Sequence, residues 1–97
     1  MPMIVTVLEA FVDPDRQRDL EVAYSDAIHD TKPAGLVRSS LLHATYDENL
    51  WRIETVWESR EALEAMRRAG GTPRGLLIFR AAGAEPALSV FEVAAAL

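Results

Sequence analysis

The sequence predicts an α+β fold in which one antiparallel sheet of four strands carries helices on one face. Segments of strand-like composition alternate with segments of helical periodicity, and only three residues separate the two middle strand segments. The elements follow in the order strand, helix, strand, strand, helix, strand, with an extra short helix before the last strand. The 97 residues are expected to form a single domain, 1–97, without an internal linker.

The first strand is expected from Met3 to Val12, where both alternating sets of side chains are mostly apolar. This pattern is typical of a strand that is covered on both faces. Asp13 and Pro14 then have the chemistry of a helix start, an N-cap followed by the first helical residue. The helix after them is expected to bury one stripe of side chains, namely Leu20, Ala23, Tyr24, Ala27 and Ile28.

The second and third strands are expected from Leu36 to Tyr46 and from Leu50 to Glu58, joined by the three residues 47–49. Such a loop favours a left-handed last residue, and asparagine, here Asn49, is the best substitute for glycine. In the resulting register Tyr46 opposes Leu50. The more apolar side of the two strands, which we assign to the helices, then carries Ser39, Leu41, His43, Thr45, Trp51, Ile53, Thr55 and Trp57.

The third strand is expected to run directly into a second helix, with Ser59 as the N-cap. This junction would fix the indole of Trp57 at the end of the strand, where a pocket between sheet and helices can open. Gly70-Gly71 ends the helix because glycine adopts the left-handed conformation without a Cβ penalty. The helix buries a stripe of Ala62, Leu63, Met66 and Ala69.

Thr72-Pro73 has the pattern of another helix start, followed by a short helix or turn over Leu76–Phe79, and the last strand is expected over Ala87–Val93. This order of elements is the ferredoxin-like split βαββαβ arrangement. Its sheet has helices on one face and leaves the other face bare. We therefore expect a homodimer through the sheet faces.

Composition excludes several classes of function. A net charge of −5 argues against binding to nucleic acid, which requires a basic surface. The chain contains no cysteine, and its two histidines are far apart with no paired carboxylates, so no metal site is expected. The apolar run near the start is too short to span a bilayer and has no basic residue before it. No membrane association is expected, and a cytoplasmic location is predicted.

Three segments of the chain resemble the antibiotic biosynthesis monooxygenase family, whose members are small dimeric α/β-barrel proteins. They are Pro33–Leu36, Val56–Ala65 and Val90–Val93. The family includes quinone-forming oxygenases that use no cofactor and related haem-degrading enzymes. The resemblance covers nearly the whole chain and implies a homodimer, a small aromatic or hydrophobic ligand and no cofactor. It also implies that Trp57 lines the cavity and stacks on an aromatic substrate.

The chain departs from the family at several positions. Many members have a histidine where this chain has Met66 and another where it has Arg74. The quinone-forming members have an asparagine four residues before the tryptophan, where Ile53 stands. Among the matched functional positions, only Trp57 carries over.

The haem-degrading members differ further from this chain. They have an asparagine in the first strand, a second tryptophan in the helix and a later histidine. This chain has no asparagine before Asn49, and Met66 and Leu76 stand at or near the other two places. These departures argue against haem degradation.

His43 is the candidate catalytic residue. An imidazole that titrates near neutral pH can take a proton from a phenol, and the resulting phenolate can give an electron to oxygen. The alternative is a structural histidine, since no carboxylate is expected on its side to orient it. For Trp57 and Tyr24 the alternative, which the base rates favour, is packing in the core, and for Arg74 it is exposure on the surface. The candidates that would shape the substrate pocket are Trp57, Tyr24, Ser39, Thr55, Met66 and Arg74.

Two functions remain open from the sequence. The first is a cofactor-independent monooxygenase that acts on a small phenolic or quinol-like compound in a cavity between sheet and helices. The second is a homodimer of the same fold that binds a small ligand or has a structural role without catalysis. Side chains that fill the space around Trp57 and His43 would argue against the first, whereas an open pocket of a few hundred Å³ there would be consistent with it.

Overall fold

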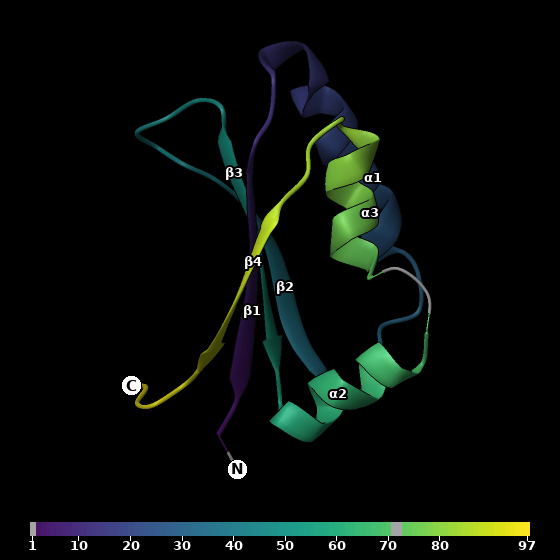
Figure 1. The fold of residues 1–97 in the computed structure, drawn as a ribbon, viewed down its shortest axis with the longest axis vertical. Coiled ribbons are helices and arrows are strands. Elements are labelled where there is room, and N and C mark those ends of the chain that lie inside the picture. The colour runs from purple at the N-terminus through teal and green to yellow at the C-terminus, as the bar shows by residue number, and fades with distance from the viewer. Residues whose placement is uncertain (1, 71–72) are drawn as a thin grey trace.

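A four-stranded antiparallel sheet forms one layer of the molecule and the helices form the other, in a computed structural model that describes residues 2–70 and 73–97 (Figure 1). The strands are β1 (Ile4–Phe11), β2 (Leu36–His43), β3 (Leu50–Trp57) and β4 (Ala87–Glu92). Their order in the sheet is β2-β3-β1-β4, and every neighbouring pair is antiparallel. This is the expected ferredoxin-like α+β arrangement.

All helices of the described chain lie on one face of the sheet (Figure 1). A short 3-10 helix, η1 (Pro14–Arg16), leads into α1 (Gln17–Ile28), and α2 (Arg60–Arg68) and α3 (Arg74–Ala81) follow β3. The predicted N-cap of α2 is confirmed, because the Ser59 hydroxyl accepts a hydrogen bond of 3.1 Å from the backbone N–H of Ala62. Gly70 then adopts a positive φ of 87° after the helix. The predicted roles of Gly71 and Thr72 lie outside the described residues.

The start of the first helix differs from the prediction. Asp13 precedes the helical segment, but its side chain makes no capping hydrogen bond, and the first turn is 3-10 rather than α-helical. Leu20 is fully buried as expected, whereas Ile28 is 60% exposed. Ile28 is the last residue of α1, so no later turn of the helix covers it.

The predicted β2–β3 hairpin is wrong in register by two residues. His43 pairs with Trp51, Leu41 with Ile53 and Ser39 with Thr55, and the connecting loop covers residues 44–49. No non-glycine residue of the described chain has a positive φ, so Asn49 is not left-handed. The Asp47 carboxylate instead accepts a hydrogen bond from the backbone N–H of Asn49, which forms an Asx turn. A shift of two residues leaves each side chain on its predicted face.

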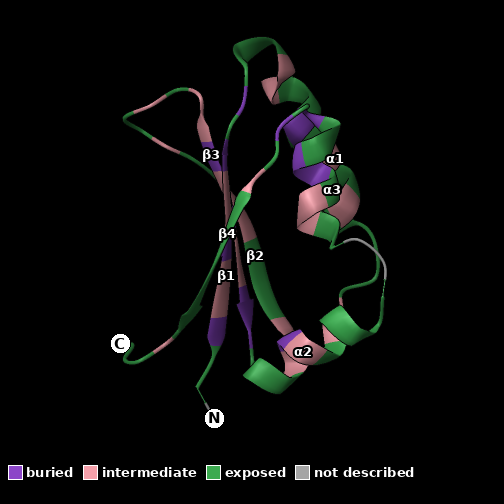
Figure 2. Ribbon diagram, in the orientation of Figure 1, coloured by how far each residue is buried: buried purple, intermediate pink, exposed green. Residues whose placement is uncertain are grey.

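The helix-covered face of the sheet contains two separate groups of buried side chains. The larger group lies under α1 and α3 and is closed by Phe79 and Leu20, both 0% exposed. The smaller group lies under α2 and consists of Ile4, Trp57 and Leu63. Figure 2 shows these buried residues on the inner sides of the helices and on β1 and β3. The two groups are separate because α2 stands apart from α1 and α3 (Figure 1).

The opposite face of the sheet has no helix over it (Figure 1). It carries exposed apolar side chains, including Leu42 and Phe91, and an ion pair in which Arg52 donates hydrogen bonds of 2.6 and 3.0 Å to Glu9. The hydrogen bonds to Glu9 raise the pKa of the Arg52 guanidinium above its ordinary value. Within residues 2–70 and 73–97, no helix has the length and apolar character needed to cross a membrane.

Candidate functional site

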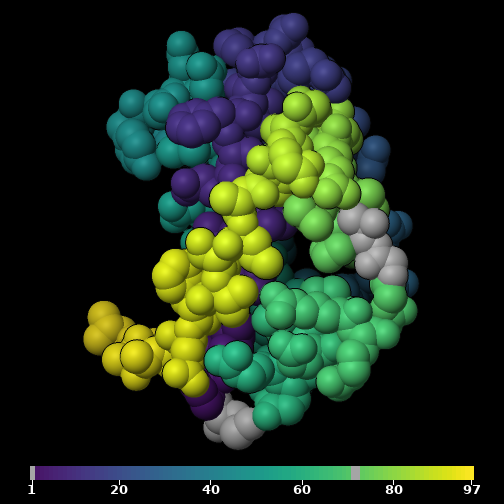
Figure 3. Space-filling model, viewed as in Figure 1, coloured from purple at the N-terminus to yellow at the C-terminus, as the bar shows by residue number. Residues whose placement is uncertain are grey.

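A cavity of about 470 Å³ lies between the sheet and the three helices. Thr6, Leu8, Ile53, Thr55 and Trp57 form its floor on the sheet. The walls come from the end of α1, from α2, from the start of α3 and from the segment that leads into β2. In the space-filling view a hollow separates the green α2 from the yellow-green α3 (Figure 3). The volume is large enough to hold a small aromatic compound.

The cavity exists because α2 and α3 approach the sheet at different places. Trp57 is the last residue of β3 and is 4% exposed. The chain enters α2 at Arg60, and Leu63 of this helix packs against Trp57. At the other wall, Gly75 lies so close to β1 that a Cβ atom there would be 2.5 Å from Cδ1 of Leu8. Glycine therefore allows α3 to close one end of the cavity against the sheet.

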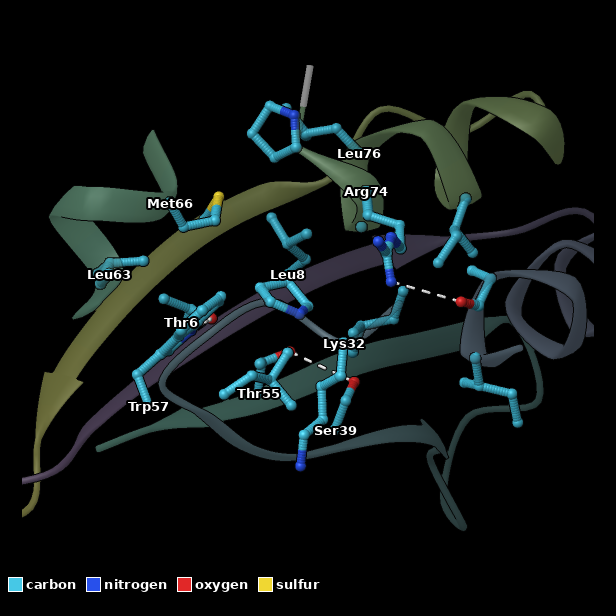
Figure 4. A pocket seen from close by; sticks show the side chains of 18 of the residues that line it. Thr6, Leu8, Lys32, Ser39, Thr55, Trp57, Leu63, Met66, Arg74 and Leu76 are labelled. Atoms are coloured by element: carbon cyan, nitrogen blue, oxygen red, sulfur yellow. Dashed lines mark hydrogen bonds between the residues drawn. The ribbon is translucent and has the colours of Figure 1, made fainter. Parts of the chain in front are cut away.

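The floor of the cavity contains a row of hydroxyl groups. Tyr24 donates a hydrogen bond of 3.0 Å to the Ser39 hydroxyl, and Thr55 donates one of 3.3 Å to the same oxygen. On the next strand Thr6 accepts a hydrogen bond of 3.2 Å from the indole N–H of Trp57. Figure 4 shows Thr6, Thr55 and Ser39 along the sheet, opposite Leu63 and Met66 of α2. These hydroxyls can orient a polar group of a ligand whose body contacts apolar walls.

Charged side chains also line the cavity. The guanidinium of Arg74 extends from the start of α3 and donates hydrogen bonds of 3.4 Å to the carbonyl of Ala27 and 3.1 Å to that of Thr31. It therefore ties α3 to the end of α1. The charged residues that line the cavity are Asp30, Lys32, Arg38, Arg67 and Arg74.

The structure brings together every residue that the sequence predicts for the substrate pocket. All of them line this one cavity, although they come from α1, β2, β3, α2 and α3. Their role in binding remains a prediction. The six residues are Tyr24, Ser39, Thr55, Trp57, Met66 and Arg74.

The structure places His43 away from this cavity, so its expected position beside the other candidates is wrong. It is the last residue of β2, and its ring stacks on Trp51 with centroids 3.9 Å apart. Its Nε2 lies 2.8 Å from the carbonyl oxygen of Glu48 in the hairpin loop. His43 lies on the predicted face of the sheet, but the prediction paired it with Ile53, two residues closer to Trp57 than its observed partner Trp51.

Sequence reasoning missed other residues of the cavity. Thr6 and Leu8 lie on the helix-covered face of β1, and the alternation of that strand could have identified them. Lys32 lies in the connection between α1 and β2, where no periodic pattern reports the direction of a side chain.

Residues 3–71 match the sequence profile of a family described as antibiotic biosynthesis monooxygenase. The chain belongs to this family. The match spans β1 to α2 and therefore includes the floor of the cavity and Trp57. No curated protein sequence matches the chain significantly.

Solved structures of low sequence identity have the same fold. SnoaB, a cofactor-independent oxygenase from Streptomyces nogalater, is 21% identical with a TM-score of 0.73, and the alignment covers 100% of this chain and 98% of SnoaB. A heme-degrading protein from Mycobacterium tuberculosis is 21% identical with a TM-score of 0.74, and 98% of each chain is covered. A conserved protein from Methanosarcina mazei is 16% identical with a TM-score of 0.74, covering 94% of this chain and 92% of that protein.

The positions at which this chain departs from the family line the cavity. Ile53, Met66 and Arg74 are all lining residues, and they replace the polar or titratable side chains noted above. Two of the three, Ile53 and Met66, are apolar. The third introduces a fixed positive charge, because arginine remains protonated throughout the physiological range.

Proposed function

We propose that this protein is a cofactor-independent monooxygenase that oxidises a small phenolic or quinol-like compound in the cavity beside Trp57. The observation that carries the proposal is the cavity itself, which combines about 470 Å³ of space, an apolar wall and a row of hydroxyls. Membership of the family supports the class of reaction.

In this reaction the substrate supplies its own electrons. A phenol, or a carbon acid activated by one, loses a proton and gives one electron to O₂. The substrate radical and superoxide then combine to form a C–O bond, and the hydroperoxide loses water to leave a carbonyl group. One oxygen atom enters the product and the other leaves as water.

The described residues suggest a division of roles. The aromatic ring of the substrate would lie against Trp57 and Met66, and its oxygen would bond to the hydroxyls of Ser39 and Thr55. We do not assign the proton transfer to His43, because that residue lies at the hairpin.

Oxygen consumption tests the proposal. A series of hydroquinones and anthrones is mixed with the protein in an oxygen electrode, with heat-denatured protein as the control for spontaneous oxidation. Uptake above the control, and its loss in Ser39→Ala/Thr55→Val protein that still binds the compound, is expected. No uptake with any compound that demonstrably binds would reject the oxygenase.

The alternative is a binding protein without catalysis, and a specific observation favours it. Ile53 and Met66 line the cavity at places where family members have asparagine and histidine. Tight binding of a hydroquinone without oxygen uptake would support this alternative. The two functions therefore separate in the same experiment.

We also propose a homodimer through the bare face of the sheet. That face exposes Leu42 (40%) and Phe91 (56%), and Val7 and Val56 lie between them on the central strands. The pair of Glu9 and Arg52 on the same face would supply polar contacts across a twofold axis.

Sedimentation equilibrium tests the dimer. The parent chain is expected at twice its monomer mass at micromolar concentration. Phe91→Asp is expected to shift it to monomer, whereas Leu77→Asp, on an exposed position of α3, leaves the dimer intact. A monomeric parent chain would contradict the proposal.

A further inference from the structure

The charged residues that line the cavity are mostly positive, although the chain as a whole is negative. The sequence has 10 lysines and arginines and 15 aspartates and glutamates. Among the described lining residues the balance is reversed, because the cations outnumber the single carboxylate of Asp30. The four cations are Lys32, Arg38, Arg67 and Arg74, of which Arg38 stands opposite Val56 in the register of the bare face.

Most of this positive charge is not neutralised by the protein. Arg67 lies 3.4 Å from Glu64, but within residues 2–70 and 73–97 no carboxylate lies within ion-pair distance of Lys32, Arg38 or Arg74. The partners of Arg74 are backbone carbonyls, which orient the guanidinium without removing its charge. Arg74 is also the first residue of α3, so the positive end of the helix dipole lies at the same wall.

The apolar residues under α2 and the guanidinium of Arg74 occupy different parts of the cavity. Leu63, Met66 and Trp57 lie together under α2, whereas Arg74 reaches down from α3 and Lys32 extends past Ser39 (Figure 4). A ligand that satisfies both parts needs an apolar ring system at one end and a negative group at the other. A neutral aromatic compound would gain nothing from the charge of the Arg74 guanidinium.

We infer that the cavity selects an aromatic anion, with the ring against Trp57 and Met66 and the anionic oxygen near the guanidinium of Arg74. The anion is a carboxylate or a phenolate, since both present an oxygen that a guanidinium or an ammonium group can bind. This inference deepens the proposed function, on which it rests only in taking the bound compound to be the substrate.

The same arrangement has a chemical consequence. Asp30 is the only carboxylate among the described lining residues, and no histidine is among them. Nearby cations favour the ionised form of a phenol and lower its pKa. A bound phenol could therefore lose its proton to water, with the fixed cations in place of a dedicated base.

Calorimetric titration with a matched pair of probes tests the selectivity. 2-Naphthoate and the neutral 2-naphthamide have the same ring system and differ in charge. We expect 2-naphthoate to bind at least about tenfold more tightly at low salt, which corresponds to about 1.4 kcal/mol. The ratio should fall in 0.5 M NaCl, because salt screens partly exposed charges. Equal affinities, or no binding of 2-naphthoate at about 1 mM, would overturn the inference.

Single substitutions assign the effect to named residues. Arg74→Gln is expected to weaken 2-naphthoate several-fold and to leave 2-naphthamide unchanged, whereas Lys32→Gln, whose side chain extends past Ser39, is expected to have a smaller effect. Arg18→Gln, which removes a charge from an exposed position of α1 outside the cavity, is the control. Because Arg74 also ties two helices together, equal weakening of both probes by Arg74→Gln would reduce the guanidinium to a structural role and overturn the inference.

4-Nitrophenol distinguishes the two kinds of anion, since its ionised form absorbs visible light. A lower apparent pKa of the bound compound supports a phenolate site, whereas an unchanged pKa together with preference for 2-naphthoate supports a carboxylate site. Oxygen uptake is measured separately. Tighter binding of 2-naphthoate without oxygen uptake would reject the oxygenase and support the anion site. Oxygen uptake without tighter binding of 2-naphthoate would support the oxygenase and reject the anion site.

Discussion

The two tryptophans of β3 lie on the same face of the sheet, yet they have opposite surroundings. Trp51 lies in the larger buried group and stacks on His43, and its buried indole N–H has no hydrogen-bond partner among the described residues. Trp57 lies beside a cavity, and its indole N–H donates to Thr6. Both side chains are about equally buried, at 5% and 4% exposure. Burial alone therefore does not distinguish a core residue from a site residue.

The arrangement of the helices explains the difference. α1 and α3 pack side by side over the end of the sheet that holds Trp51, and Phe79 and Leu20 fill the space between them. α2 covers the Trp57 end alone, with only nine residues. One short helix cannot fill the width of a four-stranded sheet, and the cavity is the space that remains.

The largest difference between the Trp51 end and the Trp57 end of the sheet is expected in the free energy of unfolding. Phe79→Ala removes a side chain that is 0% exposed and is expected to lower the free energy of unfolding by about 3–5 kcal/mol. Met66→Ala, at the cavity wall, is expected to cost about 1 kcal/mol, because the methionine already borders empty space. Urea unfolding measures both, with Leu77→Ala on the exposed side of α3 as the control. Similar costs for Phe79→Ala and Met66→Ala would mean that the cavity end is packed as tightly as the core.

A smaller difference should appear in binding. Trp57→Phe removes part of the apolar wall and the bond to Thr6, so the affinity for 2-naphthamide is expected to fall by about tenfold. The neutral probe is chosen because it does not depend on the cations. Trp51→Phe makes the same change at the filled end and is expected to leave the affinity within about twofold. Equal losses would show that the probe does not bind beside Trp57.

These comparisons also indicate which features the sequence can predict. The helix cap at Ser59 and the two faces of β3 depend only on residues that are close in the sequence, so both were predicted correctly. The register of the hairpin depends on the Asx turn at Asp47 and on hydrogen bonds that Glu48 accepts from distant residues such as Gln17. Such long-range contacts leave no local pattern, and His43 was misplaced for this reason.

The cavity shows the same limit. Each of the six predicted residues was identified from its place on one face of a helix or strand or from the family resemblance. All six line the cavity, so the predicted faces are confirmed. Of the cationic residues, Arg74 was predicted as a pocket residue, whereas Lys32 was not, because it lies in a connection. The position of the Arg74 guanidinium depends on where α3 begins relative to α1. Only the packing of α3 against the end of α1 brings the Arg74 guanidinium to the cavity.

The third prediction concerns His43 at the filled end. His43→Ala is expected to lower the free energy of unfolding by about 0.5–1.5 kcal/mol through loss of the stack on Trp51. Oxygen uptake by the variant is expected to equal that of the parent protein. Tyr46→Ala, in the same hairpin and 81% exposed, is the control for stability. A large loss of oxygen uptake with intact stability would restore His43 as a catalytic residue.

The smallest effect on stability is expected from the ion pair of Arg80 and Glu85 at the end of α3, which lines neither the cavity nor the buried group around Trp51. Arg80 donates hydrogen bonds of 3.0 and 2.8 Å to Glu85, and these bonds lower the pKa of the Glu85 carboxyl below its ordinary value. A lowered pKa in the folded state means that the pair stabilises the protein above the unfolded pKa of glutamate, about 4.3, and that this contribution disappears as the pH falls through the lowered value.

Arg80→Gln should therefore unfold slightly more easily than the parent at pH 7, and the difference should vanish in acid. Thermal unfolding from about pH 7 down to about pH 3 measures the gap between the two proteins. The gap is expected to be small because both side chains are exposed to solvent, which screens their attraction. A gap that widened as the pH fell would mean that Glu85 is not stabilised in its charged form. The affinity for 2-naphthoate should be the same in both proteins, since the pair does not line the cavity.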